Sequence, residues 1–194
     1  MYKPSKMQHY YSEIDLANGC KQRDPRAQRA LYQRYYRKMY AVCLRYTDSK
    51  EDAEDIFQEA FVKVFKGITA FRGVGSLEGW VRKIFIRTSI EYYRKRSRSV
   101  FNVNIEEAYD IGTKENLHSN INREEILKAI RELPTGYRTI FNLYAIEGYS
   151  HKEIAQMLGI SEGTSKSQLF RAKKLLQGYL SRLNEWSTLK GLAY

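Results

Sequence analysis

The sequence predicts an all-α protein of two small helical domains joined by a flexible linker. Only three of the 194 residues are proline, and apolar residues recur at helical spacing over most of the chain. Residues 98–122 lack such a period and mix Asn, Ser and Glu with isolated apolar residues, which is typical of a linker. We therefore expect an N-terminal domain over 10–97, a C-terminal domain over 123–182 and a tail over 183–194.

The N-terminal domain is expected to begin with two helices of unequal length. A short helix covers residues 12–18 and stops at Gly19. Asp24 and Pro25 then mark a strong start, because Asp is a favoured N-cap and Pro fits the first helical position. The apolar stripe of this second helix continues through residues 45–47. Its members are Ala27, Ala30, Leu31, Tyr35, Met39, Val42 and Tyr46.

Two further helices complete this domain. One covers residues 51–66 and breaks at Gly67, after which the loop FRGVGS (71–76) follows. The next opens at Ser76 or Leu77 and runs to about residue 96. The expected inward side chains of the first are Ala53, Ile56, Phe57, Ala60, Phe61, Val64 and Phe65. Those of the second are Leu77, Trp80, Val81, Ile84, Phe85 and Thr88, with Tyr92 as a further candidate.

The third and fourth helices carry opposite charge. Acidic side chains gather over residues 51–59, and basic ones over residues 82–98. The helix macrodipole favours acids in the first turn, which explains those at 51–54. It does not explain Asp55 and Glu59, which lie one turn apart further along. Acidic residues beyond the first turn favour a protein-docking face on the third helix.

The basic helix also contains aromatic residues. Aromatic faces beside Arg and Lys are suited to unstacked bases. Trp80 and Phe85 lie on the apolar side and are expected in the core, so exposed positions such as Lys83 and Arg87 are better candidates for phosphate contacts. The loop 71–76 has two interpretations: an ordinary connection, or a pocket for an everted base, since glycine permits close approach.

The C-terminal domain is expected to hold helices at about 123–132 and 136–147, followed by a helix-turn-helix motif. Ser150 can cap the first helix of the motif, and Glu153 completes a capping box. Gly159 then supplies the left-handed position that ends this helix.

The second helix of the motif begins after Ser161. One face carries Ser165, Leu169, Ala172 and Leu176, which predicts that this face is buried. The remaining faces carry small polar and basic side chains, which phosphates and base edges in a major groove require. They are Thr164, Lys166, Ser167, Gln168, Arg171, Lys173 and Lys174. A helical hairpin whose charges only face solvent is the alternative.

Composition limits the function. The formal charge of +11 favours a polyanionic partner, either nucleic acid or an anionic membrane. No apolar run approaches the roughly 20 residues that span a bilayer, and the N-terminus lacks an apolar signal core, so we expect a cytoplasmic protein without membrane insertion. With only Cys20 and Cys43, and three scattered histidines, we expect buried or half-buried thiols, no disulfide framework, no metal site and no cofactor.

Three segments in order resemble those of a known family. They are DAEDIFQEAFVKVF (52–65), the stretch 71–98, and the stretch 132–176. Together they resemble bacterial RNA polymerase sigma factors. Over about residues 12–181 the chain is similar to the small, two-domain, extracytoplasmic-function (ECF) group of the sigma-70 family.

The resemblance implies roles for particular residues. Residues 10–97 would be sigma region 2, whose DxxQE helix docks on the clamp helices of the largest polymerase subunit, and residues 123–182 would be region 4. The implied docking residues are Asp55, Gln58 and Glu59. The implied contacts to the minus-10 element are Phe71, Arg72, Ser76, Trp80, Arg82, Lys83 and Arg87. The implied contacts to the minus-35 element are Thr164, Lys166, Ser167, Gln168 and Arg171.

Two positions depart from the family pattern. Gly79 precedes Trp80 where primary sigma factors have an aromatic pair, so the helix is expected to lack the aromatic wedge with which those proteins melt DNA. Ser165 stands where relatives commonly carry a β-branched apolar residue. Its hydroxyl either weakens the apolar contact of the recognition helix or frees this residue to touch DNA.

The resulting interpretation is a sigma factor that binds polymerase core, reads the minus-35 and minus-10 elements and stabilises the melted strand. Its expected partners are polymerase core, promoter DNA and an anti-sigma factor, and the free protein is expected to be a monomer. No nucleophile–base pair or phosphate-binding loop is present, so no enzymatic activity is expected.

Two alternatives stay open at this point. A stand-alone helix-turn-helix repressor or activator would need a symmetric dimer, and it leaves the DxxQE helix unexplained. A sigma-like decoy or adaptor that binds no DNA predicts that Arg171→Ala and Lys166→Ala change nothing.

Overall fold

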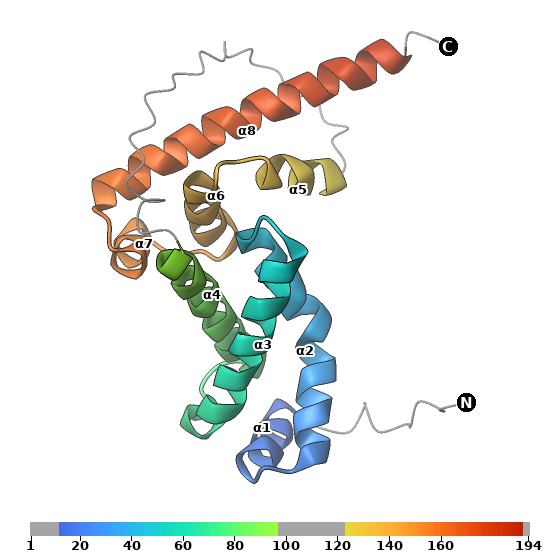
Figure 1. Cartoon of the computed structure of the whole chain (residues 1–194), viewed down its shortest axis with the longest axis vertical. Coiled ribbons are helices and arrows are strands. Elements are labelled where there is room, and N and C mark those ends of the chain that lie inside the picture. The colour runs from blue at the N-terminus through green and yellow to red at the C-terminus, as the bar shows by residue number, and fades with distance from the viewer. Residues whose placement is uncertain (1–11, 97–122, 192–194) are drawn as a thin grey trace. The chain divides into compact units, whose positions relative to one another are not determined.

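The computed structural model describes residues 12–96 and 123–191, and every regular element in these ranges is a helix (Figure 1). The chain divides into two compact units, unit 1 through Tyr93 and unit 2 from Arg94 onward. The all-α, two-domain prediction is therefore confirmed. The predicted linker, 98–122, lies outside the described residues. No helix of the described ranges combines the length and apolar character needed to cross a membrane.

Unit 1 opens with α1 (Glu13–Lys21), which Ser12 caps by accepting a hydrogen bond from the Asp15 amide at 3.1 Å. The predicted stop at Gly19 is wrong, because this residue lies inside the helix. Its role is close packing: a Cβ at Gly19 would lie only 2.6 Å from the Cβ of Ala27 on the next helix. Glycine therefore lets the two helices approach each other.

The second helix, α2 (Pro25–Tyr46), begins as predicted. The Asp24 side chain accepts a hydrogen bond from the Arg26 amide at 2.8 Å, and Pro25 is the first helical residue. The apolar stripe is buried with the exception of Ala30, which is half-buried. Both signals are local, so the sequence alone places this helix correctly.

Unit 1 also contains α3 (Lys50–Gly67), the short 3-10 helix η2 (Ile68–Ala70) and α4 (Leu77–Arg96) up to the unit boundary at Tyr93. The three long helices α2, α3 and α4 run side by side (Figure 1). An aromatic cluster joins α3 to α4, with ring centroids of Phe57, Phe61 and Phe85 between 4.9 and 5.7 Å apart. Edge-to-face and tilted rings at such distances add to the stability that their burial supplies.

The buried face of α4 is wider than predicted. Leu77, Val81, Phe85 and Thr88 are buried, whereas Trp80, Ile84 and Tyr92 are half-buried. Burial also extends to a second row, for which the sequence shows the same helical spacing. This row consists of Ile86, Ile90 and Tyr93.

Unit 2 starts with α5 (Arg123–Arg131) and α6 (Thr135–Phe141). The predicted helix 136–147 is not α-helical throughout, because a π-helical turn, η3 (Asn142–Ile146), forms its last part. The Glu147 amide donates to the Asn142 carbonyl five residues back at 3.0 Å, which is the π-helical pattern.

The motif helices α7 (His151–Leu158) and α8 (Glu162–Gly191) follow. α8 is the spine of unit 2, because α5, α6 and α7 all pack against it. Its contacts with α5 and α6 are apolar, with Leu176 among residues of α5 and Ala172 beside Tyr137 of α6. α8 continues to Gly191, so its last turns fall in the segment assigned to a tail.

Candidate functional site

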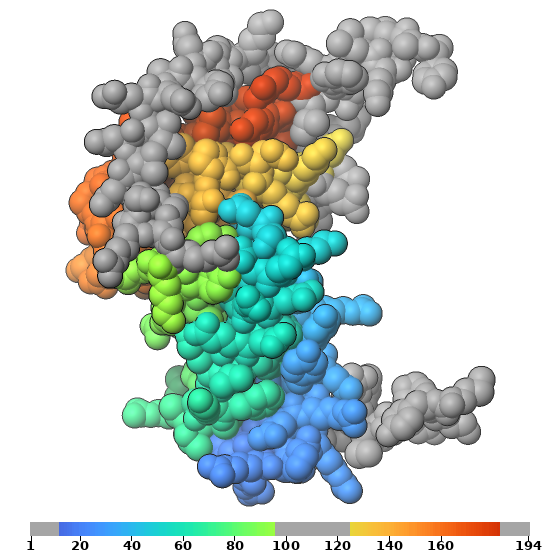
Figure 2. Space-filling model, in the orientation of Figure 1, coloured from blue at the N-terminus to red at the C-terminus, as the bar shows by residue number. Residues whose placement is uncertain are grey.

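The acidic run of α3 separates into a structural part and an exposed part. Asp52 accepts a hydrogen bond from the Tyr92 hydroxyl at 2.7 Å and so ties α3 to α4. Asp55 and Gln58 are exposed, on a helix that lies open along the face of unit 1 seen in Figure 2. Glu59 is half-buried one turn beyond Asp55. The three predicted docking residues therefore lie together on adjacent turns of one helix.

Lys63 forms an ion pair with Glu59, the third predicted docking residue. Its Nζ lies 2.8 Å from a carboxylate oxygen of Glu59 and 2.7 Å from one of Glu91 on α4. Burial lowers the pKa of Lys63, but hydrogen bonds to the two carboxylates outweigh this effect, and the net pKa is raised. The ammonium therefore stays charged at neutral pH and holds Glu59 in one orientation.

The loop between η2 and α4 is anchored at both ends and open in the middle. Phe71 is buried, and its ring centroid lies 5.7 Å from that of Trp80. Residues 72–76 are exposed, and Val74 at the tip is 87% exposed between two glycines with positive φ. Phe71 thus contributes the floor of this region, while Arg72 and Ser76 lie on its surface.

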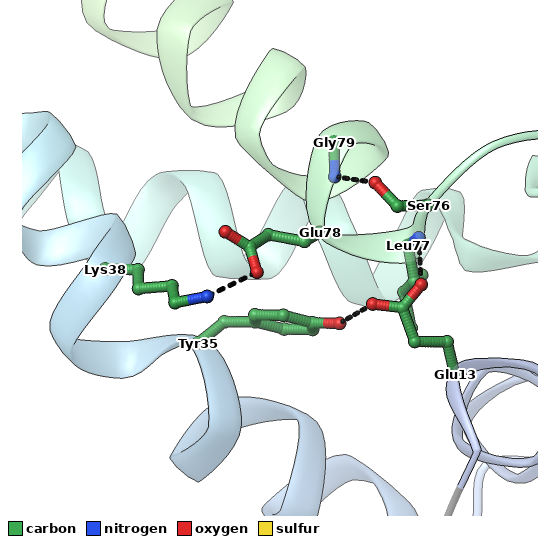
Figure 3. A network of polar contacts seen from close by, with 7 residues as sticks. All are labelled: Glu13, Tyr35, Lys38, Ser76, Leu77, Glu78 and Gly79. Carbon is green, nitrogen blue, oxygen red and sulfur yellow. Dashed lines mark hydrogen bonds and ion pairs between the residues drawn. The ribbon is translucent and has the colours of Figure 1, made fainter.

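The N-terminus of α4 is held by one hydroxyl group and one carboxylate. The Ser76 Oγ accepts a hydrogen bond from the Gly79 amide at 3.0 Å, which is a local cap. The Glu13 carboxylate of α1 accepts a second from the Leu77 amide at 2.7 Å (Figure 3). Sequence reasoning missed Glu13, because nothing local links it to a helix that begins more than sixty residues later.

The predicted phosphate contacts of α4 differ in exposure. Lys83 and Arg87 are exposed one turn apart on one side of the helix, and Arg82 is half-buried beside them. Trp80 is half-buried against the loop. The exposed side of α4 therefore carries cations, with a half-buried aromatic ring near its start, a combination that suits unstacked bases.

The helix-turn-helix of unit 2 forms as the sequence indicates. Ser150 accepts a hydrogen bond from the Glu153 amide at 3.3 Å, and Glu153 accepts one from the Ser150 amide at 2.8 Å, which completes the capping box. Gly159 has φ +71°, as the left-handed end of α7 requires. Ser161 caps α8 by accepting from the Thr164 amide at 2.9 Å.

The predicted recognition face of α8 is accessible at most positions. Lys166, Ser167 and Arg171 are exposed, and Thr164 is half-buried. Gln168 contradicts the expectation, since it is only 7% exposed. The reason is that three helices pack around α8, so its buried arc includes this position. Phe170, which the sequence analysis left out, is instead 69% exposed on the same stretch.

Ser165 is buried and polar contacts replace the apolar contact expected there. Its Oγ lies 2.9 Å from Nδ1 of His151, at the first turn of α7. The imidazole stacks on Tyr144, with ring centroids 4.6 Å apart at an angle of 22°. Of the two readings of this departure, the one that frees Ser165 to touch DNA is therefore wrong.

Two family models match the chain. Residues 31–99 match the model described as Sigma-70 region 2, and residues 123–176 match the one described as Sigma-70, region 4. The chain is 30% identical over 181 residues to the ECF RNA polymerase sigma-E factor of Haemophilus influenzae, covering 87% of this chain and 95% of the relative. It is 29% identical to RNA polymerase sigma factor SigV of Bacillus subtilis, covering 74% and 84% respectively.

Solved structures share the fold. The sigma factor RpoE of Bartonella quintana, in complex with the anti-sigma factor NepR, matches with a TM-score of 0.50 at 22% identity over 79% of this chain and 96% of that one. CnrH, in complex with the cytosolic domain of CnrY, matches with a TM-score of 0.50 at 20% identity over 88% and 97%. At these identities the similarity concerns the fold alone.

Proposed function

Because the chain belongs to the extracytoplasmic-function group of the sigma-70 family, we propose that it binds the core of bacterial RNA polymerase and directs transcription initiation at promoters it selects. The observation that carries this function is the presence of both region models, in order, in a chain that matches a sigma-E factor over nearly the full length of that relative. A stand-alone repressor would need only the helix-turn-helix. The sigma-factor function is therefore supported over that alternative.

The polymerase core docks on the outer side of α3, through Asp55, Gln58 and Glu59. Support comes from the exposure of the first two and from the ion pair that holds the third. Carboxylates that need no rearrangement lose less side-chain entropy on binding than mobile ones. The acidic face thus suits a partner surface with basic side chains.

The minus-10 element is recognised by the 71–76 loop together with the start of α4. Arg72, Ser76, Lys83 and Arg87 offer hydrogen bonds and charge to the backbone of the melted strand, and Arg82 lies beside them. The half-buried Trp80 supplies the aromatic surface on which an unstacked base packs, and the buried Phe71 ring lies against Trp80. Binding of the displaced bases stabilises the open strand, so opening needs no hydrolysis step.

The minus-35 element is recognised by the first turns of α8. Lys166, Ser167 and Arg171 reach the major groove, and Thr164 lies at the helix start, whereas Gln168 is buried. Cationic side chains give salt-dependent affinity, while the few base contacts decide which promoter is bound.

The minus-10 and minus-35 binding surfaces act together only when the protein is bound to the polymerase. We assign region 2 to residues 10–97, a linker to 98–122 and region 4 to 123–182. Two weak DNA contacts on one scaffold gain effective concentration, and their spacing becomes part of promoter choice. The sigma-70 family is not a family of catalytic enzymes, and we propose no reaction for this chain. It works in the cytoplasm as a monomer, and an anti-sigma factor is its proposed inhibitor.

Run-off transcription tests this function. Purified bacterial core polymerase is given a library of promoter fragments with and without the protein. Promoter-specific transcripts that depend on the protein are expected, and their start sites would reveal both DNA elements. If core stays inactive while the protein alone shifts duplex DNA as a dimer, the repressor function replaces the proposal. If neither occurs, the adaptor alternative gains support.

A further inference from the structure

A carboxylate from α1 joins three helices of unit 1. The Glu13 Oε2 accepts a hydrogen bond from the Leu77 amide at 2.7 Å, at the first residue of α4. Its Oε1 accepts one from the Tyr35 hydroxyl of α2 at 3.0 Å (Figure 3). Both carboxylate oxygens therefore have a donor, and each donor belongs to a different helix.

A helix start of this kind does not need a distant group. Ser76 already provides the local cap through the Gly79 amide. Glu13 instead fixes where the first turn of α4 lies, because its carboxylate connects that turn to α1 and α2. An ion pair between Lys38 of α2 and Glu78 of α4, 2.6 Å long, lies in the same place but is largely exposed. Exposed pairs contribute little, so Glu13 is the stronger tie.

The position of Leu77 decides the position of the loop before it. Phe71 anchors the loop at one end, with its buried ring and an amide that donates to the Ile68 carbonyl at 3.1 Å. Leu77 is fully buried and anchors the other end. Between them a Cβ at Gly73 or Gly75 would meet open space within 4 Å. The path of the loop therefore depends on its two ends.

We propose that Glu13 is a positioning residue for minus-10 recognition, which holds the end of the 71–76 loop and the first turn of α4 where an unstacked base binds. This inference rests on the proposed function. Glu13 touches no DNA itself. It acts through the Leu77 amide, and Tyr35 orients it.

The ionisation of Glu13 agrees with this role. Burial raises its pKa, but hydrogen bonds from the Leu77 amide and the Tyr35 hydroxyl, together with the charge of Arg34, outweigh burial and lower it. The carboxylate is therefore ionised throughout the neutral range. A charged acceptor at a helix N-terminus is also favoured by the helix macrodipole.

Three variants separate positioning from charge. Glu13→Ala removes both hydrogen bonds. Glu13→Gln removes the charge but keeps the connection, since its oxygen can accept from Leu77 while its amide donates to the Tyr35 oxygen. Glu78→Ala is the matched control, because it removes the exposed ion pair at the same helix turn and leaves Glu13 in place.

The readouts use full-length protein with core polymerase. The DNA is a fork-junction probe of the strongest promoter from the run-off library, with 2-aminopurine in the single-stranded minus-10 element. Glu13→Ala is expected to weaken fork binding about tenfold, the size of a lost charge-assisted hydrogen bond. Affinity for core and for a minus-35 duplex should not change. Glu13→Gln should retain most of the fork binding, and Glu78→Ala all of it.

Hydrogen exchange on the free protein gives a test that needs no DNA. Exchange of the Leu77 amide is expected to accelerate in Glu13→Ala and to stay slow in Glu13→Gln. Unchanged Leu77 exchange, unchanged fork binding, or equal losses for fork and minus-35 DNA would each overturn the positioning role. If wild-type holoenzyme fails to bind the fork, the proposed function fails first. Altered Leu77 exchange would then show a purely structural role for Glu13.

Discussion

The Nδ1 atom of His151 and the Oγ atom of Ser165 lie 2.9 Å apart and join the first turn of α7 to the buried face of the recognition helix. Ser165 is fully buried, and the imidazole is fixed on its other side by stacking on Tyr144. This polar contact thus joins α7 to α8 within their packed interface.

The effects of His151 and Ser165 substitutions on the free energy of unfolding should not be additive. Single changes His151→Ala and Ser165→Ala and the double change form a mutant cycle, read by urea unfolding of the full chain. We expect a coupling free energy of about 1 kcal/mol, the usual net value of an intramolecular hydrogen bond. Strictly additive effects would show that the two groups do not interact in solution.

The acidic face of α3 should affect core binding and not folding. Asp55→Ala combined with Glu59→Ala is expected to weaken affinity for polymerase core, because Asp55 is exposed and Glu59 is partly exposed one turn away. The unfolding free energy should fall by less than about 1 kcal/mol, since Glu59 loses only a partly exposed ion pair. Glu51→Ala, an exposed acid in the first turn of the same helix, is the control. Equal core affinity for all three proteins would remove the docking assignment.

Arg171 should distinguish promoters. Arg171→Ala is expected to reduce discrimination by about 1–3 kcal/mol if the side chain reads a base, and to weaken all DNA equally if it binds a phosphate. Lys128→Ala removes the same charge from an exposed position on α5 and tests the contribution of net charge alone. Holoenzyme binding to a panel of minus-35 variants measures both. Identical behaviour of the two variants would place Arg171 off the DNA.

Substitutions at two neighbouring residues of α8 should change stability to very different extents. Leu169 is buried, so Leu169→Ala is expected to cost about 2–5 kcal/mol and to unfold unit 2 at lower temperature. Phe170 is mostly exposed, so Phe170→Ala should change stability by no more than about 0.5 kcal/mol. Calorimetry of the two variants decides. A similar loss for both would contradict the orientation of α8.

The two thiols should make unit 1 less stable in alkali. Burial raises the pKa of Cys20 from 9.0 to about 11 and that of Cys43 from 9.0 to about 12. Their contribution is full below pH 9 and is lost as pH rises toward these values, because unfolded thiols ionise first. Cys43→Ala should flatten the fall in unfolding free energy above pH 9. A thiol reagent that labels native protein rapidly at pH 7 would contradict the burial.

Local signals of the sequence were sufficient for most of the fold. The Asp24–Pro25 start and the Ser150–Glu153 box involve residues that are neighbours in the chain, so their partners are visible in the sequence. Gly19 was misassigned because the same residue type ends a helix or admits close packing, and only the presence of Ala27 decides between them. Distant partners cannot be read from spacing.

The candidate site was predicted less completely for the same reason. At about 100° per residue, Gln168 lies roughly 40° from Ala172, so its exposure depends on how many helices cover α8. The sequence shows which side of α8 is apolar but not how wide the buried side is. Because three helices pack against α8, the buried side is wide enough to include Gln168. Glu13 was missed because its cap joins segments far apart in the chain.

The contact between Gly19 and Ala27 has a genetic consequence. A single added methyl group at Gly19 cannot fit 2.6 Å from the Ala27 Cβ, so α1 would have to move away from α2. Glu13 is on α1 and would move with it, away from the Leu77 amide. If Glu13 positions the minus-10 site, a substitution at Gly19 is expected to impair promoter opening, although Gly19 itself contacts no DNA.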